Sequence, residues 1–141
     1  MKSVFILMLP FLILTFSASG QHHNQITGKW LSEGGDSQIE IFQKSNKYFG
    51  KIIWLREPNQ PNGKPKVDKN NSNSELREIP ILGLEIISSL EYDGEKWVNG
   101  KIYSPKEGQT VNCSKLLLDE STLKVTVSKF LFSTTKIWKR L

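Results

Sequence analysis

The sequence contains one cysteine, Cys113, among its 141 residues. A single cysteine excludes an intrachain disulfide, so the fold must be held together by hydrophobic burial. Cys113 has no histidine near it in the sequence and falls inside a strand-like run, which favours a buried structural thiol over a nucleophile. The two histidines, His22 and His23, stand together without further ligands, and we therefore predict no metal site and no cofactor.

Long hydrophobic runs are also missing, except at the start of the chain. Val4–Phe16 is almost wholly apolar, follows the positive Lys2 and precedes the small residues Ala18–Gly20. This order is typical of a secretory signal peptide, and the run is shorter than the ~18 residues that indicate a membrane span. We predict that residues 1–20 are a signal peptide cleaved near Gly20. Residues 21–141 would then form one exported domain, periplasmic or secreted, with no transmembrane segment.

Neither sign of charge dominates the sequence. The formal net charge is +5, from 19 Lys and Arg against 14 Asp and Glu, and Lys2 belongs to the predicted signal peptide. An excess of this kind can indicate an anionic partner such as nucleic acid or a membrane surface, but such a partner requires clustered cations. Because the lysines are scattered, we favour a mixed, soluble surface and expect no nucleic-acid partner.

Helical periodicity is absent, whereas Val, Ile, Thr and aromatic residues occur in short runs separated by turn-forming residues such as Ser45-Asn46 and Asp93-Gly94. Such runs predict an all-β chain, and the short connections make neighbouring strands antiparallel. Eight strands of this length can close into a barrel, which removes exposed sheet edges. We expect strands near residues 26–31, 36–43, 47–55, 84–91, 96–103, 109–118, 121–128 and 131–139.

Gly-Lys followed by an apolar residue occurs three times, beginning at Gly28, Gly50 and Gly100. These glycines lie inside strand-like runs, where glycine often marks a bulge or a tight bend that helps a sheet to curve. The alternative, a phosphate-binding loop, would need a glycine-rich loop before a helix, and the sequence has none. We therefore expect the glycines to bend strands.

One polar segment interrupts the strands. Glu57–Ser74 is 18 residues long and rich in Pro, Asn and Lys. Loops of this length in compact domains are usually functional lids or disordered segments. The residues from Ser74 can form one helical turn before Pro80 ends it.

An ordered set of motifs resembles the domain of unknown function 2147 (DUF2147) family of exported bacterial proteins across nearly the whole mature chain. The motifs are Gly28-x-Trp30, GKIIWL at 50–55, Asp68-x-Asn70, Arg77, PILGL at 80–84, GKIYSP at 100–105 with Gly108, and Trp138-Lys139-Arg140. The resemblance implies a lipocalin-like β-barrel and no established activity. The chain also resembles the lipocalin pattern, in which an Arg of the last strand covers the Trp of the first strand. The chain departs from the family pattern at Val111 and over residues 125–137.

Counting strand directions assigns different roles to the two ends of a single up-and-down barrel. If the first strand starts at the end that holds Trp30, the last strand returns Trp138 and Arg140 to the same end, beside Trp30. Gly28 belongs to this end as well. The turns at 32–36 and 104–108 and the long segment at 57–79 then share the opposite rim. We predict an end closed by aromatic residues and a guanidinium, and an open end covered by a lid.

Polar residues near the open rim are the candidates for ligand contacts. Asp68, Asn70 and Arg77 either orient a ligand together or, if Asp68 pairs with Arg77, pin the loop, and Tyr103 joins them as a ligand or lid candidate. Glu85 and Glu91 can suggest an acid–base pair, but their alternating positions favour an outward, solvated face.

Three functions remain open after these assignments. The first is binding of a small apolar or amphipathic molecule in the barrel, and the second is an envelope interaction or structural protein with a filled barrel. The third, a hydrolase or isomerase that uses Asp68 and Arg77, lacks a nucleophile with an assigned base, so we predict no catalytic residues. The volume of the cavity should separate the first two. The sequence does not determine the oligomeric state.

Overall fold

The computed structural model describes residues 25–141. The predicted signal peptide at 1–20, together with His22 and His23, lies outside these residues. Within the described part of the chain, no helix is both long enough and apolar enough to span a membrane.

The described residues form β-strands and one 3-10 turn. The strands are β1 (Gly28–Leu31), β2 (Ser37–Lys44), β3 (Lys47–Leu55), β4 (Glu85–Tyr92), β5 (Trp97–Val98), β6 (Gly100–Ser104), β7 (Gln109–Asp119), β8 (Thr122–Lys129) and β9 (Phe132–Arg140). The expected strand at 96–103 is divided into β5 and β6 because Asn99 has a positive φ of 62°. The turn η1 (Ser74–Leu76) begins where the sequence predicted it.

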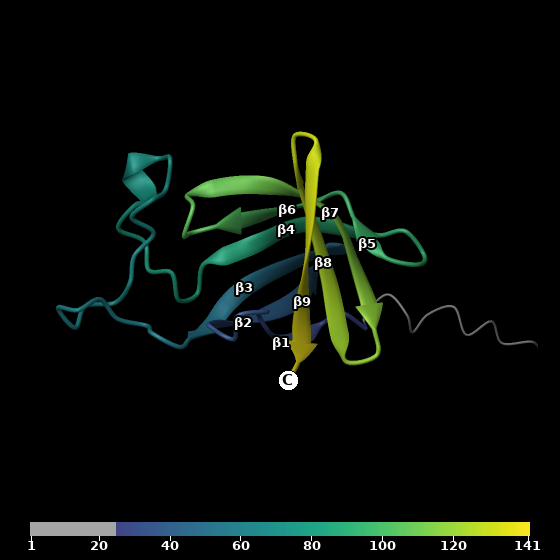
Figure 1. The fold of residues 1–141 in the computed structure, drawn as a ribbon, viewed down its shortest axis with the longest axis horizontal. Helices are drawn as coiled ribbons and strands as arrows, with labels where there is room; N and C mark the ends of the chain where they lie inside the picture. The colour runs from purple at the N-terminus through teal and green to yellow at the C-terminus, as the bar shows by residue number, and fades with distance from the viewer. Residues whose placement is uncertain (1–24) are drawn as a thin grey trace, which may run out of the picture.

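The strands pair antiparallel in the order β3-β2-β1-β9-β8-β7-β5-β4-β6, and an additional β3–β4 pairing closes the sheet. Because β5 and β6 are two parts of one strand, the result is a closed, eight-stranded, antiparallel barrel, and the predicted fold class is confirmed. Figure 1 shows β1, β2 and β3 on one side of the barrel, β4 and β6 on the other, and β8 and β9 between them.

The inward side chains fill much of the barrel. Trp30 and Trp97 are almost fully buried, and they belong to a continuous core cluster with Ile39, Ile41, Tyr48, Ile87, Leu90, Leu116 and Leu123. Cys113 lies in the same core, where burial raises the pKa of its thiol to about 12. The burial of this cysteine agrees with the structural role expected from the sequence.

The predicted contact between Trp30 and Arg140 is confirmed. The Arg140 guanidinium carbon lies 4.2 Å from the centroid of the Trp30 ring, and the two residues are cross-strand partners. Arg140 also donates to the carbonyl oxygens of Thr27 (3.2 Å) and Gln25. Gly28 has a φ of +122°, and a Cβ there would lie 3.2 Å from an Arg140 nitrogen, so glycine leaves room for the guanidinium. Trp138 is buried in the same core.

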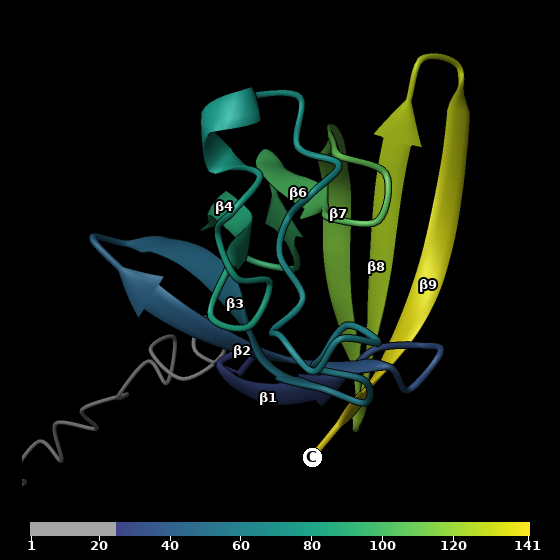
Figure 2. The same cartoon turned by 90° about the vertical axis from the view of Figure 1, so that its left-hand side faces the viewer.

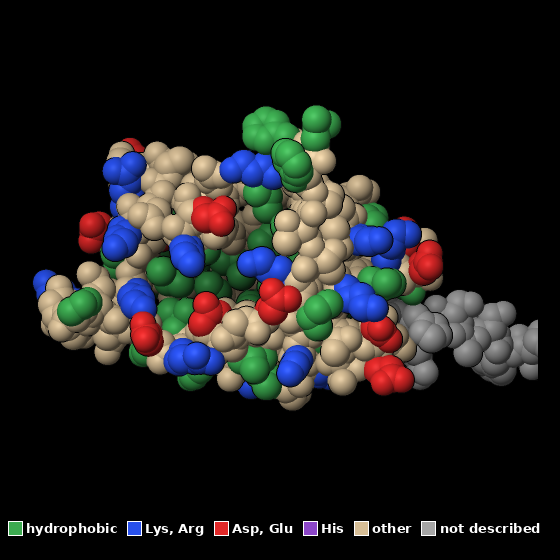
Figure 3. Space-filling model, in the orientation of Figure 1, with side chains coloured by type: hydrophobic (Ala, Val, Ile, Leu, Met, Phe, Trp, Pro, Cys, Tyr) green, Lys and Arg blue, Asp and Glu red, His purple; other side chains and the backbone are tan. Residues whose placement is uncertain are grey.

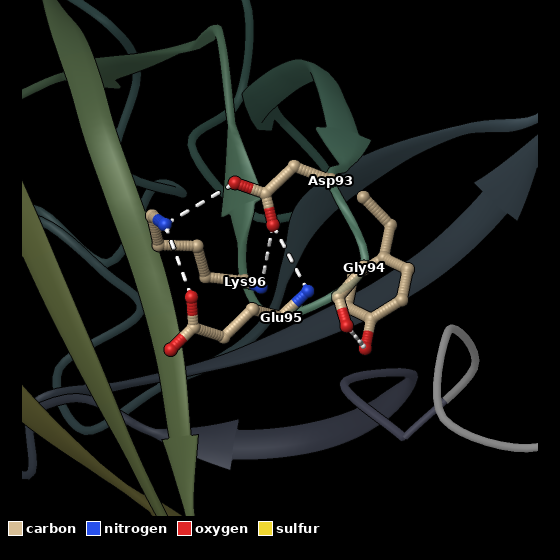
Figure 4. A network of polar contacts seen from close by, with 5 residues as sticks. Asp93, Gly94, Glu95 and Lys96 are labelled. Atoms are coloured by element: carbon tan, nitrogen blue, oxygen red, sulfur yellow. Dashed lines mark hydrogen bonds and ion pairs between the residues drawn. The ribbon is translucent and has the colours of Figure 1, made fainter.

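The aromatic closure extends to the β4–β5 turn, which the sequence analysis did not include. The centroid of the Trp97 ring lies 4.8 Å from the centroid of the Tyr92 ring and 6.1 Å from that of the Tyr48 ring. Figure 4 shows the turn that follows Tyr92, where the Asp93 carboxylate accepts the backbone N–H groups of Glu95 and Lys96. The hydrogen bond from the Lys96 backbone is the largest cause of the lowered pKa of Asp93. The capped turn fixes the strand end that carries Trp97.

Two of the three repeated glycines lie at irregular points of the sheet, as expected. The β3–β4 register shifts on both sides of Gly50, and Gly100 begins β6 directly after the break at Asn99. A Cβ on Gly50 would lie 2.9 Å from the Ile87 side chain, and one on Gly100 would lie 2.5 Å from Leu90. These glycines therefore allow both curvature and close packing of the core.

The closed end predicts a large effect of Trp30→Ala. Removing this fully buried ring deletes its packing and the surface on which Arg140 stacks, so the free energy of unfolding should fall by ~3–5 kcal/mol. Urea denaturation measures the change. Trp54→Ala is the matched control because Trp54 is 40% exposed, and it should have a much smaller effect. Equal losses in the two variants would contradict the assigned closure.

Candidate ligand-binding site at the open rim

The segment at 57–79 is attached to both neighbouring turns of the rim. The backbone N–H of Arg56, directly before the segment, donates to the Asp36 carbonyl at 2.9 Å. The Asn70 side-chain amide donates to the Lys106 carbonyl at 2.9 Å. Figure 2 shows this segment passing in front of the strand ends. The expected grouping of the 32–36, 57–79 and 104–108 connections at one rim is therefore confirmed.

Asp68 is the buried polar group of this segment, with 1% of its surface exposed. The Tyr103 hydroxyl lies 2.8 Å from each carboxylate oxygen of Asp68 and donates to them. The Asn71 side-chain amide donates to one of these oxygens at 2.7 Å. Since a buried carboxylate is costly unless it is hydrogen-bonded, these donors hold the segment against β6.

The alternative in which Asp68 pairs directly with Arg77 is wrong. No ion pair joins the two side chains, both of which lie in the described part of the chain. Arg77 instead donates from Nε to the Asn71 carbonyl at 2.8 Å. The physical reason is that Tyr103 and Asn71 already satisfy the carboxylate, while the 3-10 turn at 74–76 directs Arg77 to the backbone of the same loop. Arg77 therefore supports the segment through Asn71.

The backbone of Asn70 lies close against Gly108 in the neighbouring turn. Gly108 has a φ of +65°, and a Cβ there would lie 1.8 Å from the Asn70 carbonyl oxygen. Both the backbone conformation and the space therefore require glycine at this position. Gly108 was part of the motif set of the sequence, but its contact with Asn70 was not foreseen.

The Asp68–Tyr103 pair changes the acidity of the tyrosine. Burial, followed by the hydrogen bond to the Asp68 carboxylate, raises the pKa of Tyr103 to about 12 from the model-compound value of 10.0. A phenolate beside the carboxylate would be repelled by it and would also lose the donated hydrogen bond. The pair is therefore stable while Tyr103 is protonated.

A cavity of about 600 Å³ lies between the segment and the barrel. Its apolar lining comes from the end of β3 (Ile52 and Leu55), from the segment (Val67) and from the PILGL motif that follows it (Ile81). Its charged lining consists of Asp36, Arg56, Glu57, Lys66, Lys69 and Lys106. Figure 3 shows a hollow with hydrophobic side chains at its bottom and charged side chains of both signs around it. An apolar floor with a charged edge suits a small molecule that has an apolar body and a polar end.

The candidate residues from the sequence are divided between two places. Asn70 lines the cavity, whereas Asp68 and Tyr103 line a second, more open hollow of about 670 Å³ on the other side of the segment. Arg77 is exposed and belongs to the lining of neither. The structure thus brings Asp68 and Tyr103 together as a loop anchor and places Asn70 nearer the cavity.

Sequence reasoning missed the apolar lining of the cavity. Val67 is the one β-branched residue in the polar stretch at 57–74, which was a usable signal that it faces the interior. Ile81 lies in the PILGL motif, which was noted for resemblance without a packing role. Strand counting brings the end of the strand with Ile52 and Leu55 to the rim, but which of its side chains face the cavity depends on how the barrel closes.

The remaining acidic candidates are surface residues. Glu91 forms an ion pair with Lys47 at 3.0 Å, and both side chains are about half exposed. The hydrogen bond from Lys47 is the main reason that the pKa of Glu91 is lowered. Glu85 is exposed at the start of β4. Their expected position on the outward face is confirmed.

Comparisons with known proteins give a family match and a structural match. A sequence profile described as "Uncharacterized protein conserved in bacteria (DUF2147)" matches residues 28–140. Among solved structures, the chain is similar to one described as "Protein HP1028 from the human pathogen Helicobacter pylori belongs to the lipocalin family". The identity is 26%, the TM-score is 0.66, and the match covers 74% of this chain and 72% of that one. A comparison with curated proteins finds no significant match.

The Asp68–Tyr103 pair predicts a loss of stability in alkali. Because the folded pKa of Tyr103 is about 12 and the model-compound value is 10.0, the contribution of this hydroxyl is complete below about pH 10 and disappears as the pH rises towards 12. Tyr103→Phe should lower the free energy of unfolding by roughly 1–3 kcal/mol at neutral pH, and the difference from the wild type should shrink in alkali. Chemical denaturation across this pH range measures both.

Tyr92→Phe is the control for this experiment. It removes a hydroxyl that donates to the exposed Gly94 carbonyl at 2.8 Å, so it should leave the alkaline behaviour of the wild type intact. The Cys113 thiol, whose raised pKa falls in the same range, contributes equally to the pH dependence of every variant, so its contribution cancels when the variants are compared. A constant difference between wild type and Tyr103→Phe at every pH would contradict the pairing.

Proposed function

This chain belongs to the DUF2147 family, which confirms the resemblance seen in its motifs, and we propose that it is an exported protein that binds one small apolar or amphipathic molecule. The lipocalin-like barrel supports small-molecule binding in general. The proposal places the ligand in the cavity between the 57–79 segment and the end of β3.

The observation that carries the proposal is the apolar floor of this cavity. Its volume of about 600 Å³ falls within the range of roughly 300–1,000 Å³ that is usual for sites of small ligands. Ile52, Val67 and Ile81 offer apolar surface, and the Asn70 side chain and the nearby cations can orient a polar end. The core beneath is filled by Trp30 and Trp97, so the ligand would occupy the rim of the barrel and not its whole length.

The other two hypotheses account for fewer of these features. A filled barrel would favour an envelope interaction protein, and the packed closed end agrees with that, but the apolar cavity at the rim would then have no role. The third hypothesis, a hydrolase or isomerase, requires the side chains of Asp68 and Arg77 to act together. The two side chains have different partners, and Asp68 is occupied in anchoring the loop.

Export is proposed from the sequence of residues 1–20, with a positive residue, an apolar run and small residues in the order of a signal peptide. We also propose that the 57–79 segment acts as a lid. Its anchors, Asp68 to Tyr103 and Asn70 to the 104–108 turn, are few and lie at the rim, so the segment can open without unfolding the core.

Filling the cavity tests the proposed function. Ile81→Trp places a large ring against the apolar floor and should weaken the binding of 8-anilinonaphthalene-1-sulfonate, an apolar probe with an anionic end, by about tenfold or more. Fluorescence titration measures the affinity. The matched control is Leu82→Trp at the next position, which is half exposed and outside the cavity lining.

The control should bind the probe as the wild type does, and both variants should keep the wild-type denaturation midpoint. Equal affinity of all three proteins would contradict binding at this cavity. Native mass spectrometry of protein purified from its own host then identifies a retained natural ligand, and Ile81→Trp should lose it.

A further inference from the structure

The turn between β8 and β9 carries three consecutive, highly exposed hydrophobic side chains. Phe130 is 93% exposed, Leu131 is 96% exposed and Phe132 is 79% exposed. The other large hydrophobic side chains of residues 25–141 are at most 59% exposed. Single exposed apolar residues are common on proteins, but a contiguous exposed group usually marks a surface that contacts something.

The backbone conformation of this turn makes large hydrophobic residues unusual at its positions. Lys129 and Phe132 are cross-strand partners, so Phe130 and Leu131 form a two-residue hairpin turn. Phe130 has a positive φ of 54°. Turns of this kind favour Gly, Asn or Asp, and a bulky residue at positive φ is disfavoured. Neither turn formation nor core packing accounts for Phe130 and Leu131, which points to a function at the tip.

The hairpin also projects from the barrel. β1 pairs with β9 only through Trp30 with Arg140 and Leu31 with Lys139. The remainder of β9 pairs with β8, and Figures 1 and 2 show the β8–β9 turn extending beyond the other strands. The hydrophobic tip is therefore narrow and convex, and this shape can insert into a deformable surface.

The charge of the hairpin indicates what kind of surface this is. Residues 121–141 contain no Asp or Glu, and of their five cationic residues three, Lys124, Lys139 and Arg140, lie at the end of the hairpin away from the tip. Lys129 stands directly beside the tip, and Lys136 lies further along β9. Cations around an inserted apolar group are the pattern that favours binding to anionic lipids.

The size of the tip argues against a protein partner. A stable protein interface buries about 800 Å² on each partner, and three side chains at the end of a two-stranded ribbon offer much less flat surface than this. A lipid surface, in contrast, can surround a convex tip on all sides. The shape and the charge therefore favour the same occupant.

We propose that the β8–β9 tip docks on an anionic lipid surface, with Phe130, Leu131 and Phe132 in the interfacial layer and Lys129 among the headgroups. The proposal concerns where the protein is held and does not require the rim cavity to contain a ligand. It extends the proposed function, because the exported barrel would be located at a membrane surface.

The first test compares binding to vesicles of phosphatidylcholine mixed with phosphatidylglycerol. Wild type should bind, and the triple variant Phe130→Ser, Leu131→Ser, Phe132→Ser should bind at least about 100-fold more weakly, because three apolar side chains no longer leave water. Leu82→Ser, which removes an exposed leucine from another loop, should bind as the wild type. All proteins share one N-terminus, so any contribution of the apolar run at 4–16 is the same in each.

Lys129→Gln separates the charge from the apolar insertion. It should weaken binding to the anionic vesicles and have little effect on vesicles of phosphatidylcholine alone. Since the tip residues are exposed, every variant should keep the wild-type denaturation midpoint, which shows that a loss of binding is not a loss of folding.

A second test reports directly on the tip. Leu131→Cys can be labelled with an environment-sensitive fluorophore because the buried Cys113 thiol, with its pKa of about 12, is unreactive at neutral pH. The label should move to an apolar environment when anionic vesicles are added, whereas the same label at Leu82→Cys should not.

Several results would overturn the proposal. The first is a wild type that does not bind these vesicles. The second is a triple variant that binds them as tightly as the wild type, or a Leu82→Ser variant that loses binding. The third is a tip label whose fluorescence does not change when vesicles are added. Tip-dependent self-association in the absence of lipid, or tip-dependent binding to a protein partner with no affinity for vesicles, would also replace the lipid surface as the occupant.

Discussion

Closure of the barrel depends on the contact between Arg140 and Trp30. The backbone pairing of β1 with β9 comprises only two residue pairs, which is a short seam for joining the first and last strands of a sheet. The guanidinium strengthens it by stacking on the indole and donating to the Thr27 and Gln25 carbonyls. A cation–π contact contributes ~0.5–2 kcal/mol. Gly28 is part of this arrangement because it leaves the space that the guanidinium needs.

The short seam also determines the shape of the rest of the barrel. Because β1 ends at Leu31, most of β9 continues without a strand on its second side. The Glu33 carboxylate accepts the Ile137 backbone N–H at 3.1 Å and covers part of this edge. The exposed residues of β9 include Ser133, Thr134, Thr135 and Lys136, and polar and cationic residues of this kind discourage edge-to-edge pairing with another chain. The hairpin is thereby left free to project with its apolar tip.

The two ends of the barrel solve different physical problems. At the closed end, aromatic rings fill the space and a capped turn fixes the strand end that carries Trp97. At the rim, the 57–79 segment satisfies many of its own backbone groups and is attached by a few specific contacts, of which Asp68 to Tyr103 is the most buried. A segment that is held by a few contacts outside the core can move while the core stays folded. This is the arrangement that the proposed lid requires.

Some features followed from the sequence alone, because they depend on local pattern and chain order. Alternation of apolar and polar residues with short turns predicted the all-β class and seven of the eight strand runs as single elements, and strand counting placed Trp30 and Arg140 at one end and the three connections at the other. Those deductions need only the two-residue period of a strand and antiparallel neighbours. Asn99 was different, since a positive φ within a strand run has no reliable signal in Asn alone.

Only the tertiary structure decided how the rim residues are partnered. Asp68, Asn70, Arg77 and Tyr103 were all proposed from the sequence. The side-chain partner considered there for Asp68 was Arg77, whereas the donor in the structure is Tyr103, because of where β6 and the 3-10 turn lie in space. The apolar lining from Ile52, Val67 and Ile81 likewise comes from segments that meet only when the barrel closes. Periodicity specifies which face of a strand is buried, whereas long-range packing specifies what that face meets, and the candidate site is made of such long-range contacts.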